Sequence, residues 1–196
     1  MRKRKSIEER KEEVFIIISQ IIAEQGLSEV STVEVAKRLG VSQPAIYKYF
    51  KNKDEMIIYF VEHLKKQLKE IIEKAKEEKT SRDKLKKIYT EHLKLLQKTK
   101  ILPRVIFSDV IYLGNPQKKE KLKEAILYYK EGITKIFEDG IKKGEIVEID
   151  PNMGARFFIG SIISTTLMWM LNNMNYKMTN DIEKLMDTLD KLFIKK

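Results

Sequence analysis

Residues 31–54 constrain the fold most, because they carry the start and stop signals of two short helices separated by a tight turn. Ser31 is a favoured N-cap residue, and Glu34 three positions later completes a capping box. Gly40 supplies the left-handed conformation that ends many helices. Ser42 then caps the second helix, so the connection is only about three residues long. The pattern predicts a helix-turn-helix.

The outward face of the second helix has the chemistry of a major-groove reader. Ile46 and Phe50 lie four positions apart and are expected to be buried with Val41. A glutamine can pair bidentately with adenine, an alanine methyl can contact a thymine methyl, and tyrosine and lysine can bind phosphates. A solvated helix face is the alternative. The residues left pointing outward are Gln43, Ala45, Tyr47 and Lys48.

At these residues the chain resembles the tetracycline-repressor (TetR) family of bacterial transcriptional regulators. The resemblance extends over about residues 8–68 and is only architectural beyond them. It implies an N-terminal three-helix DNA-binding domain, a larger helical domain for ligand binding and dimerisation, and a homodimer on double-stranded DNA. The matching residues are Val35-Ala36, Leu39-Gly40-Val41-Ser42, Ile46-Tyr47, Tyr49-Phe50 and Lys53.

The resemblance also implies which residues contact DNA, with Lys53 opening the next helix beside a phosphate. Two positions depart from the family pattern. Val33 stands where some relatives carry a polar or basic residue, and Pro44 replaces the glycine of most members. The operator sequence therefore does not transfer. The DNA-binding residues predicted in this way are Thr32, Gln43, Pro44, Ala45, Tyr47, Lys48, Tyr49 and Lys53.

Net charge gives only weak support for DNA binding. The chain carries a formal charge of +10, but residues 1–55 hold 11 basic and 9 acidic residues, so most of the excess lies elsewhere. The basic residues at positions 2–5 predict an arm along phosphates or in the minor groove, with a disordered terminus as the alternative. No apolar stretch follows them, so they are not a secretory signal. With no cysteine in the chain, a cytoplasmic location is expected.

The rest of the chain is predicted to be helical. A long helix should start at residues 52–55 and run to about Lys79, and no segment shows the alternation of a half-buried strand. The prediction is an all-α fold of about nine helices, with a DNA-binding domain at 1–54 (helix-turn-helix at 31–50) and an effector-binding and dimerisation domain at 55–196. Breaks are expected at Thr80-Ser81, Pro103, Leu113–Pro116, Gly140, Gly144, Asp150-Pro151 and 175–180.

Residues 157–171 are uncharged and apolar on almost every side. The run is shorter than the about 20 residues of a membrane span, so no membrane contact is predicted. A buried core helix and a subunit interface are the two remaining interpretations, and they are compatible. Small residues in this run would let a partner helix approach closely, and Met168 and Trp169 would fill the contact. The resemblance implies that the last two helices pair with their mates in a dimer, which predicts interface residues Ser161, Ser164, Met168, Leu185, Leu189 and Leu192.

The sequence contains no phosphate-binding glycine loop, metal-spaced cluster or nucleophile with a base. We therefore predict no enzyme activity, cofactor or metal site. The resemblance implies an unidentified small-molecule effector, apolar or amphipathic, in the larger domain. Aromatic and histidine residues are candidates for its cavity, with ordinary core packing as the alternative. The predicted pocket residues are Phe60, His63, Phe107, Tyr112 and Tyr128.

The leading hypothesis is a homodimeric transcriptional regulator, most simply a repressor of a palindromic operator. The resemblance implies that its effector would shift the helix that begins at Lys53 and so change the separation of the two DNA-binding heads. One alternative is a helical ligand-binding protein or enzyme whose helix-turn-helix is purely structural. The other is a chromosome-organising protein that binds DNA of any sequence.

Overall fold

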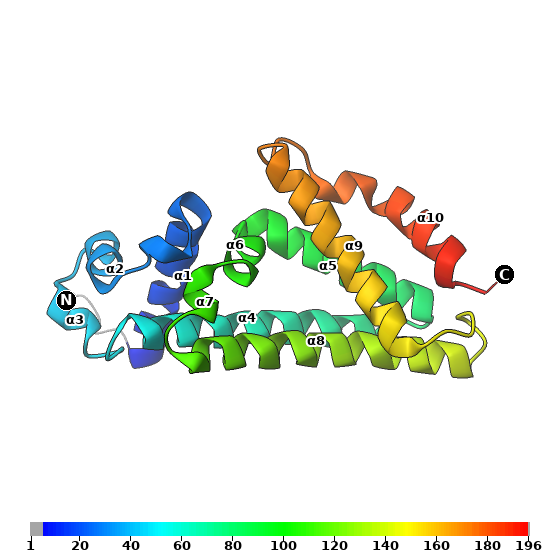
Figure 1. Ribbon diagram of the computed structural model, residues 1–196, viewed down its shortest axis with the longest axis horizontal. Helices are drawn as coiled ribbons and strands as arrows, with labels where there is room; N and C mark the ends of the chain where they lie inside the picture. The colour runs from blue at the N-terminus through cyan, green and yellow to red at the C-terminus, as the bar shows by residue number, and fades with distance from the viewer. Residues whose placement is uncertain (1–5, 196) are drawn as a thin grey trace. The chain divides into compact units, whose positions relative to one another are not determined.

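The computed structural model describes residues 6–195, so the predicted basic arm at residues 1–5 lies outside the described part. Between residues 6 and 195 every regular element is helical, apart from an isolated bridge joining Ile146 to Ile194. The predicted all-α class is confirmed, with ten α-helices over those residues where about nine were expected (Figure 1). They are α1 (Ile7–Gln25), α2 (Thr32–Leu39), α3 (Gln43–Ile46), α4 (Lys53–Lys76), α5 (Ser81–Thr99), α6 (Leu102–Ile106), α7 (Asp109–Tyr112), α8 (Pro116–Lys142), α9 (Pro151–Leu171) and α10 (Ile182–Phe193), with 3₁₀-helices η1 (Leu27–Glu29) and η2 (Met178–Asp181).

The chain forms two compact units. The first contains the residues up to Leu64 together with Thr99–Lys123, and the second contains Lys65–Lys98 and the chain from Glu124 onward. These units do not follow the single boundary predicted at residue 54. The first unit takes in the start of α4, all of α6 and α7, and the start of α8. Long-range packing of α6 on α1 brings the second segment into this unit, and such packing leaves no local sequence signal.

The core of the first unit is built on α1. A capping box at Ser6 starts this helix, and its apolar side chains recur at the spacing that puts them on one face. Phe15 stacks on Phe60 of α4 with ring centroids 5.3 Å apart. Each fully buried aliphatic side chain contributes about 1.5–3 kcal/mol of transfer free energy, so this face stabilises the unit strongly. The fully buried members are Val14, Ile18, Ile21 and Ile22.

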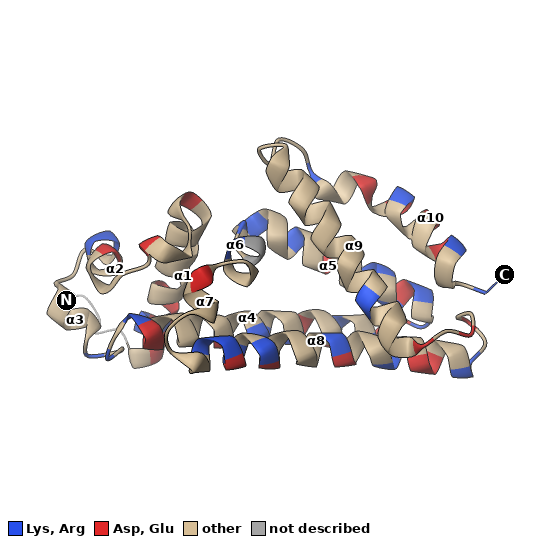
Figure 2. Ribbon diagram, in the orientation of Figure 1, with Lys and Arg blue, Asp and Glu red and all other residues tan. Residues whose placement is uncertain are grey.

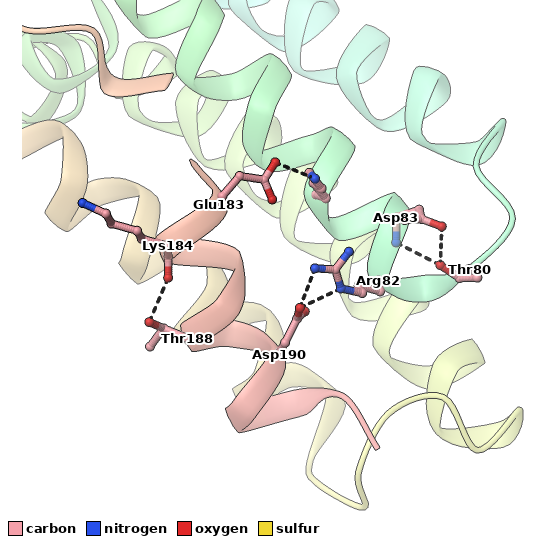
Figure 3. A network of polar contacts seen from close by, with 8 residues as sticks. Thr80, Arg82, Asp83, Glu183, Lys184, Thr188 and Asp190 are labelled. Atoms are coloured by element: carbon pink, nitrogen blue, oxygen red, sulfur yellow. Dashed lines mark hydrogen bonds and ion pairs between the residues drawn. The ribbon is translucent and has the colours of Figure 1, made fainter. Parts of the chain in front are cut away.

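In the second unit, α5, α8, α9 and α10 enclose an aromatic core. Tyr89 of α5 meets Phe158 of α9 edge to face with centroids 5.5 Å apart, and Phe137 of α8 meets Phe193 of α10 at 5.2 Å. Ion pairs add a link between α5 and α10 (Figure 3). The Arg82 guanidinium lies 2.6 Å from the Asp190 carboxylate, and Lys86 lies 2.7 Å from Glu183. The buried apolar residues of α10 are Ile182, Met186, Leu189 and Phe193.

Some predicted helix boundaries were wrong. The helix α4 ends at Lys76, three residues before the predicted end, and Pro103 lies in the first turn of α6, where proline is tolerated. Gly140 does not end α8, which continues to Lys142. A Cβ atom at Gly140 would lie 2.6 Å from the nearest atom of Ile146, so this glycine is a close-packing site. The helix ends before Gly144, whose φ of +71° is the left-handed conformation expected of a C-terminal glycine.

We predict that Gly140→Ala destabilises the protein by about 1–2 kcal/mol, although alanine favours a helix more than glycine does. The added methyl group would overlap the buried Ile146 side chain and the Ser81 hydroxyl. Urea unfolding measures the effect. Glu138→Ala is the control, because Glu138 is exposed on the same helix, and its effect should stay within about 0.5 kcal/mol. A Gly140→Ala protein as stable as the parent would contradict the packing argument.

Candidate DNA-binding surface and helical domain

The predicted N-cap of the helix-turn-helix is confirmed, but the predicted capping box is not complete, because the Glu34 carboxylate accepts a hydrogen bond from Arg38 Nε at 2.8 Å. The Ser31 hydroxyl accepts a hydrogen bond from the Glu34 backbone N–H at 3.1 Å, and Gly40 ends α2 in the left-handed conformation. The second helix is shorter than predicted. Regular α-helix in α3 stops at Ile46, and a turn carries the chain to Phe50, whose N–H donates to the Ile46 carbonyl at 3.1 Å. Ile46 and Phe50 are buried as expected, whereas Val41 is only half-buried.

Three of the predicted DNA-binding residues form one hydrogen-bonded cluster. The Gln43 amide nitrogen donates to the Thr32 hydroxyl at 2.9 Å and to the Tyr47 hydroxyl at 3.3 Å. Tyr47 is 49% exposed, whereas Thr32 is buried. Bidentate pairing with adenine uses both the oxygen and the nitrogen of a glutamine amide. Gln43 is therefore held in place, and bidentate pairing with adenine would require one of these two internal hydrogen bonds to be exchanged.

The other predicted DNA contacts surround this cluster. Pro44 and Lys48 are exposed, and Ala45 and Tyr49 are half-buried. Lys53 opens α4 and donates from Nζ to the Ser28 carbonyl at 2.7 Å. Partial burial lowers the pKa of Lys53, with the nearby Lys118 charge as a further cause. All eight residues belong to the first unit, and six of them lie close together in the sequence, within residues 43–49.

Three features near this surface were not predicted from the sequence. Val33 is 58% exposed at the start of α2, beside the buried Thr32. Lys118 of α8 is buried and lies 2.8 Å from Asp54, the residue after Lys53. The local sequence around either residue does not indicate the contact between Lys118 and Asp54, because the two residues are far apart in the chain. Arg38 is held by Glu24 and Glu34, each at 2.8 Å, so its charge is already paired.

Family models match most of the chain. A model described as bacterial regulatory proteins of the tetR family matches residues 19–60, and one described as the C-terminal region of YsiA-like proteins matches residues 60–195. The chain belongs to the tetR family of bacterial regulatory proteins. It is accordingly a DNA-binding transcriptional regulator, which confirms that part of the leading hypothesis from the sequence.

Several characterised members are similar over most of their length. The fatty acid metabolism regulator protein of Bacillus subtilis is 29% identical over 159 residues, covering 80% of this chain and 81% of that one. A structure of FadR from Bacillus subtilis in complex with stearoyl-CoA has a TM-score of 0.79 and 27% identity, covering 91% and 96%. The nucleoid occlusion factor SlmA of Glaesserella parasuis is 23% identical over 195 residues, covering 97% and 95%.

The second unit contains a half-open cavity of about 420 Å³ between α4, α5 and α8. Of the five residues predicted to line an effector pocket, Tyr128 lines this cavity. The other four belong to the first unit, so the five residues are not gathered at this site. The lining combines apolar side chains with three lysines and two acidic residues. The lining residues are Ile72, Lys76, Lys84, Tyr128, Glu131, Gly132, Lys135, Ile136 and Asp139.

The remaining four predicted pocket residues have different surroundings. Phe60 is completely buried against Phe15, and His63 stacks on the same ring with centroids 3.8 Å apart. Phe107 is 69% exposed and Tyr112 is 50% exposed. Core packing therefore accounts for Phe60 and His63. Sequence spacing gave no means of separating buried aromatic residues from cavity-lining ones.

A buried polar pair joins α5 to α8 in the second unit. The His92 Nδ1 atom lies 2.7 Å from the Tyr129 hydroxyl, and the two rings meet edge to face. Burial lowers the pKa of His92 from 6.5 to about 4 and raises the pKa of Tyr129. The imidazole is therefore neutral at pH 7, and the pair satisfies two polar groups inside the core.

The predicted dimer face lies on α9 and α10. Five of its six predicted residues line a shallow groove of about 540 Å³: Ser161, Ser164, Leu185, Leu189 and Leu192. Met168 is 52% exposed on α9, but Trp169 is buried and donates to the Tyr176 carbonyl, so it is not available to fill a contact. In Figure 2 the helix α9 is almost free of charge. Among the described helices it is also the one long and apolar enough to cross a membrane, and a third of that stretch is buried.

We predict that Gln43→Ala reduces discrimination by about 1–3 kcal/mol at one base position of each half-site, because the base loses a bidentate partner. Lys53→Ala should instead weaken binding to all duplexes and reduce the salt slope by about one per head. Titration of duplexes substituted at each position measures both effects. Lys66→Ala removes a charge on the exposed surface of α4 and serves as the control. Equal losses on every duplex for Gln43→Ala would contradict base reading.

We also predict that His92 makes the stability depend on pH. The unfolded chain takes up a proton near pH 6.5, whereas folded His92 resists protonation down to about pH 4. Stability present above pH 6.5 is therefore lost as the pH falls towards 4, by about 2–4 kcal/mol. Urea unfolding at each pH should show a steeper loss for the parent than for His92→Asn, which does not titrate. Parallel curves would contradict the assignment.

Proposed function

We propose that this protein is a cytoplasmic, homodimeric repressor that binds a palindromic operator and leaves it when a small amphipathic molecule binds the helical domain. The hydrogen-bonded cluster of Thr32, Gln43 and Tyr47 carries the proposal. A purely structural helix-turn-helix has no need of a half-buried amide held beside an exposed tyrosine and an exposed lysine. Phosphate-binding residues around the amide then fix its register on the duplex.

The apolar groove between α9 and α10 supports the dimer. Its exposed side chains include Phe157 at 65% and Leu192 at 58%, and a solvated monomer gains nothing from such a surface. Ion pairs to α5 occupy the polar edge of α10, so its apolar edge is left for a partner. A two-fold interface would set two reading heads about 34 Å apart, the spacing of successive major grooves.

The cavity in the second unit supports an amphipathic effector. Its apolar lining residues suit a hydrocarbon tail, and Lys84 and Lys135 among the lining residues suit an anionic head. Because the similar FadR of Bacillus subtilis was solved in complex with stearoyl-CoA, we propose a long-chain acyl-CoA as the effector class. A tenfold loss of operator affinity needs only about 1.4 kcal/mol of differential binding. Burial of two or three methylene groups supplies that amount.

Selection from random duplex DNA tests the specific function. Enrichment of a palindrome is expected, and the salt dependence of the selected duplex then gives the number of phosphate contacts. Addition of palmitoyl-CoA should release the duplex, whereas CoA alone should not. The similarity to SlmA favours a second candidate, a chromosome-associated DNA binder. Retention of all sequences with equal affinity would support that candidate and reject the operator-specific repressor.

The dimer is tested by Leu192→Glu. A carboxylate placed in the apolar groove would be desolvated in the dimer but not in the monomer, so dissociation and a loss of operator affinity of at least tenfold are expected. Sedimentation and duplex titration measure the two effects. Lys191→Glu places a carboxylate at the neighbouring exposed position, outside the groove, and should leave the dimer intact. A dimeric Leu192→Glu protein would show that the interface lies elsewhere.

A further inference from the structure

A lysine is buried beside the start of α4. Lys118, in the first turn of α8, is only 5% exposed, and its ammonium lies 2.8 Å from the carboxylate of Asp54. An ammonium group taken out of water strongly destabilises a protein unless an opposite charge lies next to it. Asp54 is therefore tied to Lys118 in the folded first unit. The contact fixes the first turn of α8 against the first turn of α4.

The fixed residue adjoins a predicted phosphate contact. Lys53 immediately precedes Asp54 and donates to the Ser28 carbonyl, on the segment just before α2. The Asn52 side chain accepts from the Glu55 N–H and so begins α4 at this point. The start of α4 is thus held from two sides, by η1 through Lys53 and by α8 through Asp54. The burial and the Lys118 charge that lower the pKa of Lys53 reflect the same crowding.

The helix that carries Lys118 also lines the cavity of the second unit. Six of the nine lining residues belong to α8, from Tyr128 to Asp139. One turn after Lys118, a second pair links the same two helices, with Lys121 lying 3.5 Å from Glu62. That pair is more exposed, with side-chain exposures of 35% and 51%. Exposed pairs are worth little, whereas a buried pair is sensitive to small displacements.

We propose that the Lys118–Asp54 pair is the positioning contact that holds Lys53 and the start of α4 in the DNA-binding geometry, and that α8 alters this contact when the cavity is occupied. This inference rests on the proposed function. Lys118 and Asp54 are positioning residues that act through Lys53. An effector shifts the equilibrium between two conformations only if it binds one of them more tightly. We expect the cavity to be shaped differently in the conformation in which α8 has moved Lys118 away from Asp54.

Asp54→Asn gives the sharpest test, because a pure charge effect and the positioning role predict opposite changes in operator affinity. Removal of an acid beside the DNA would strengthen binding if only net charge mattered. The positioning role predicts operator binding at least tenfold weaker, and a smaller release by palmitoyl-CoA. Glu62→Gln removes the same charge from the exposed pair on the same helix and is the matched control. Asp54→Glu keeps the carboxylate and should recover at least half of the lost affinity.

Lys118→Met tests the partner, with Lys121→Met as its control for lost positive charge. The double variant Asp54→Asn, Lys118→Met leaves no buried charge, so it keeps the experiment decisive if a single variant unfolds below the assay temperature. Its loss of affinity should match that of one single variant, because both changes remove one contact. Thermal unfolding confirms that each protein is folded.

The outcomes separate this inference from the proposed function. A parent protein that selects no palindrome overturns the proposed function itself. A parent that binds its palindrome, with Asp54→Asn binding as tightly or more tightly, overturns the positioning role alone. Equal weakening by Asp54→Asn and Glu62→Gln would also overturn it, since that result assigns the effect to net charge.

Discussion

The packing of α4 against α8 is the constraint on which the rest of the structure depends. Both helices contribute to both compact units, and in each unit they contact one another. Glu62 pairs with Lys121 in the first unit, and Lys65 pairs with Glu124 in the second. Farther along, a Cβ atom at Gly132 would lie 3.0 Å from Ile72. The contacts advance in the same direction along both helices, so a displacement of one helix is resisted along its whole length.

Local signals in the sequence were sufficient to find the DNA-binding unit. Ser31 and Gly40 define α2 because a cap and a left-handed glycine act on the residues beside them. The same reasoning failed at Gly140, where a missing side chain allows close packing and does not end the helix. It also gave α3 too many residues. Phe50 is buried, as its four-residue spacing from Ile46 predicts. A turn after α3, and not a continued α-helix, brings its side chain into the core.

Tertiary contacts explain why the candidate sites were predicted unevenly. The residues around Gln43 lie within a short stretch of chain, so their grouping follows from one turn. The cavity takes its lining from the consecutive helices α4 and α5 and from α8, which is far from both in sequence, and only Tyr128 was found in advance. Lys118 reads as an ordinary surface lysine in a lysine-rich segment. Its burial becomes evident only when α8 is placed beside α4, because the lysine can be buried only where a carboxylate of α4 pairs with its charge.

The magnitudes indicate why a buried ion pair suits control of this regulator. Removal of one partner from a fully buried pair costs about 3–5 kcal/mol. Asp54 is still 34% exposed, so the cost here is smaller, but a tenfold change in operator affinity needs only about 1.4 kcal/mol. Partial separation of Lys118 from Asp54 is therefore enough, and the chain need not unfold or repack its cores. An exposed pair such as Lys121–Glu62 contributes about 0–1 kcal/mol and would transmit less than a tenfold change. Burial of the lysine is thus the property that gives a small displacement of α8 a measurable effect at the DNA.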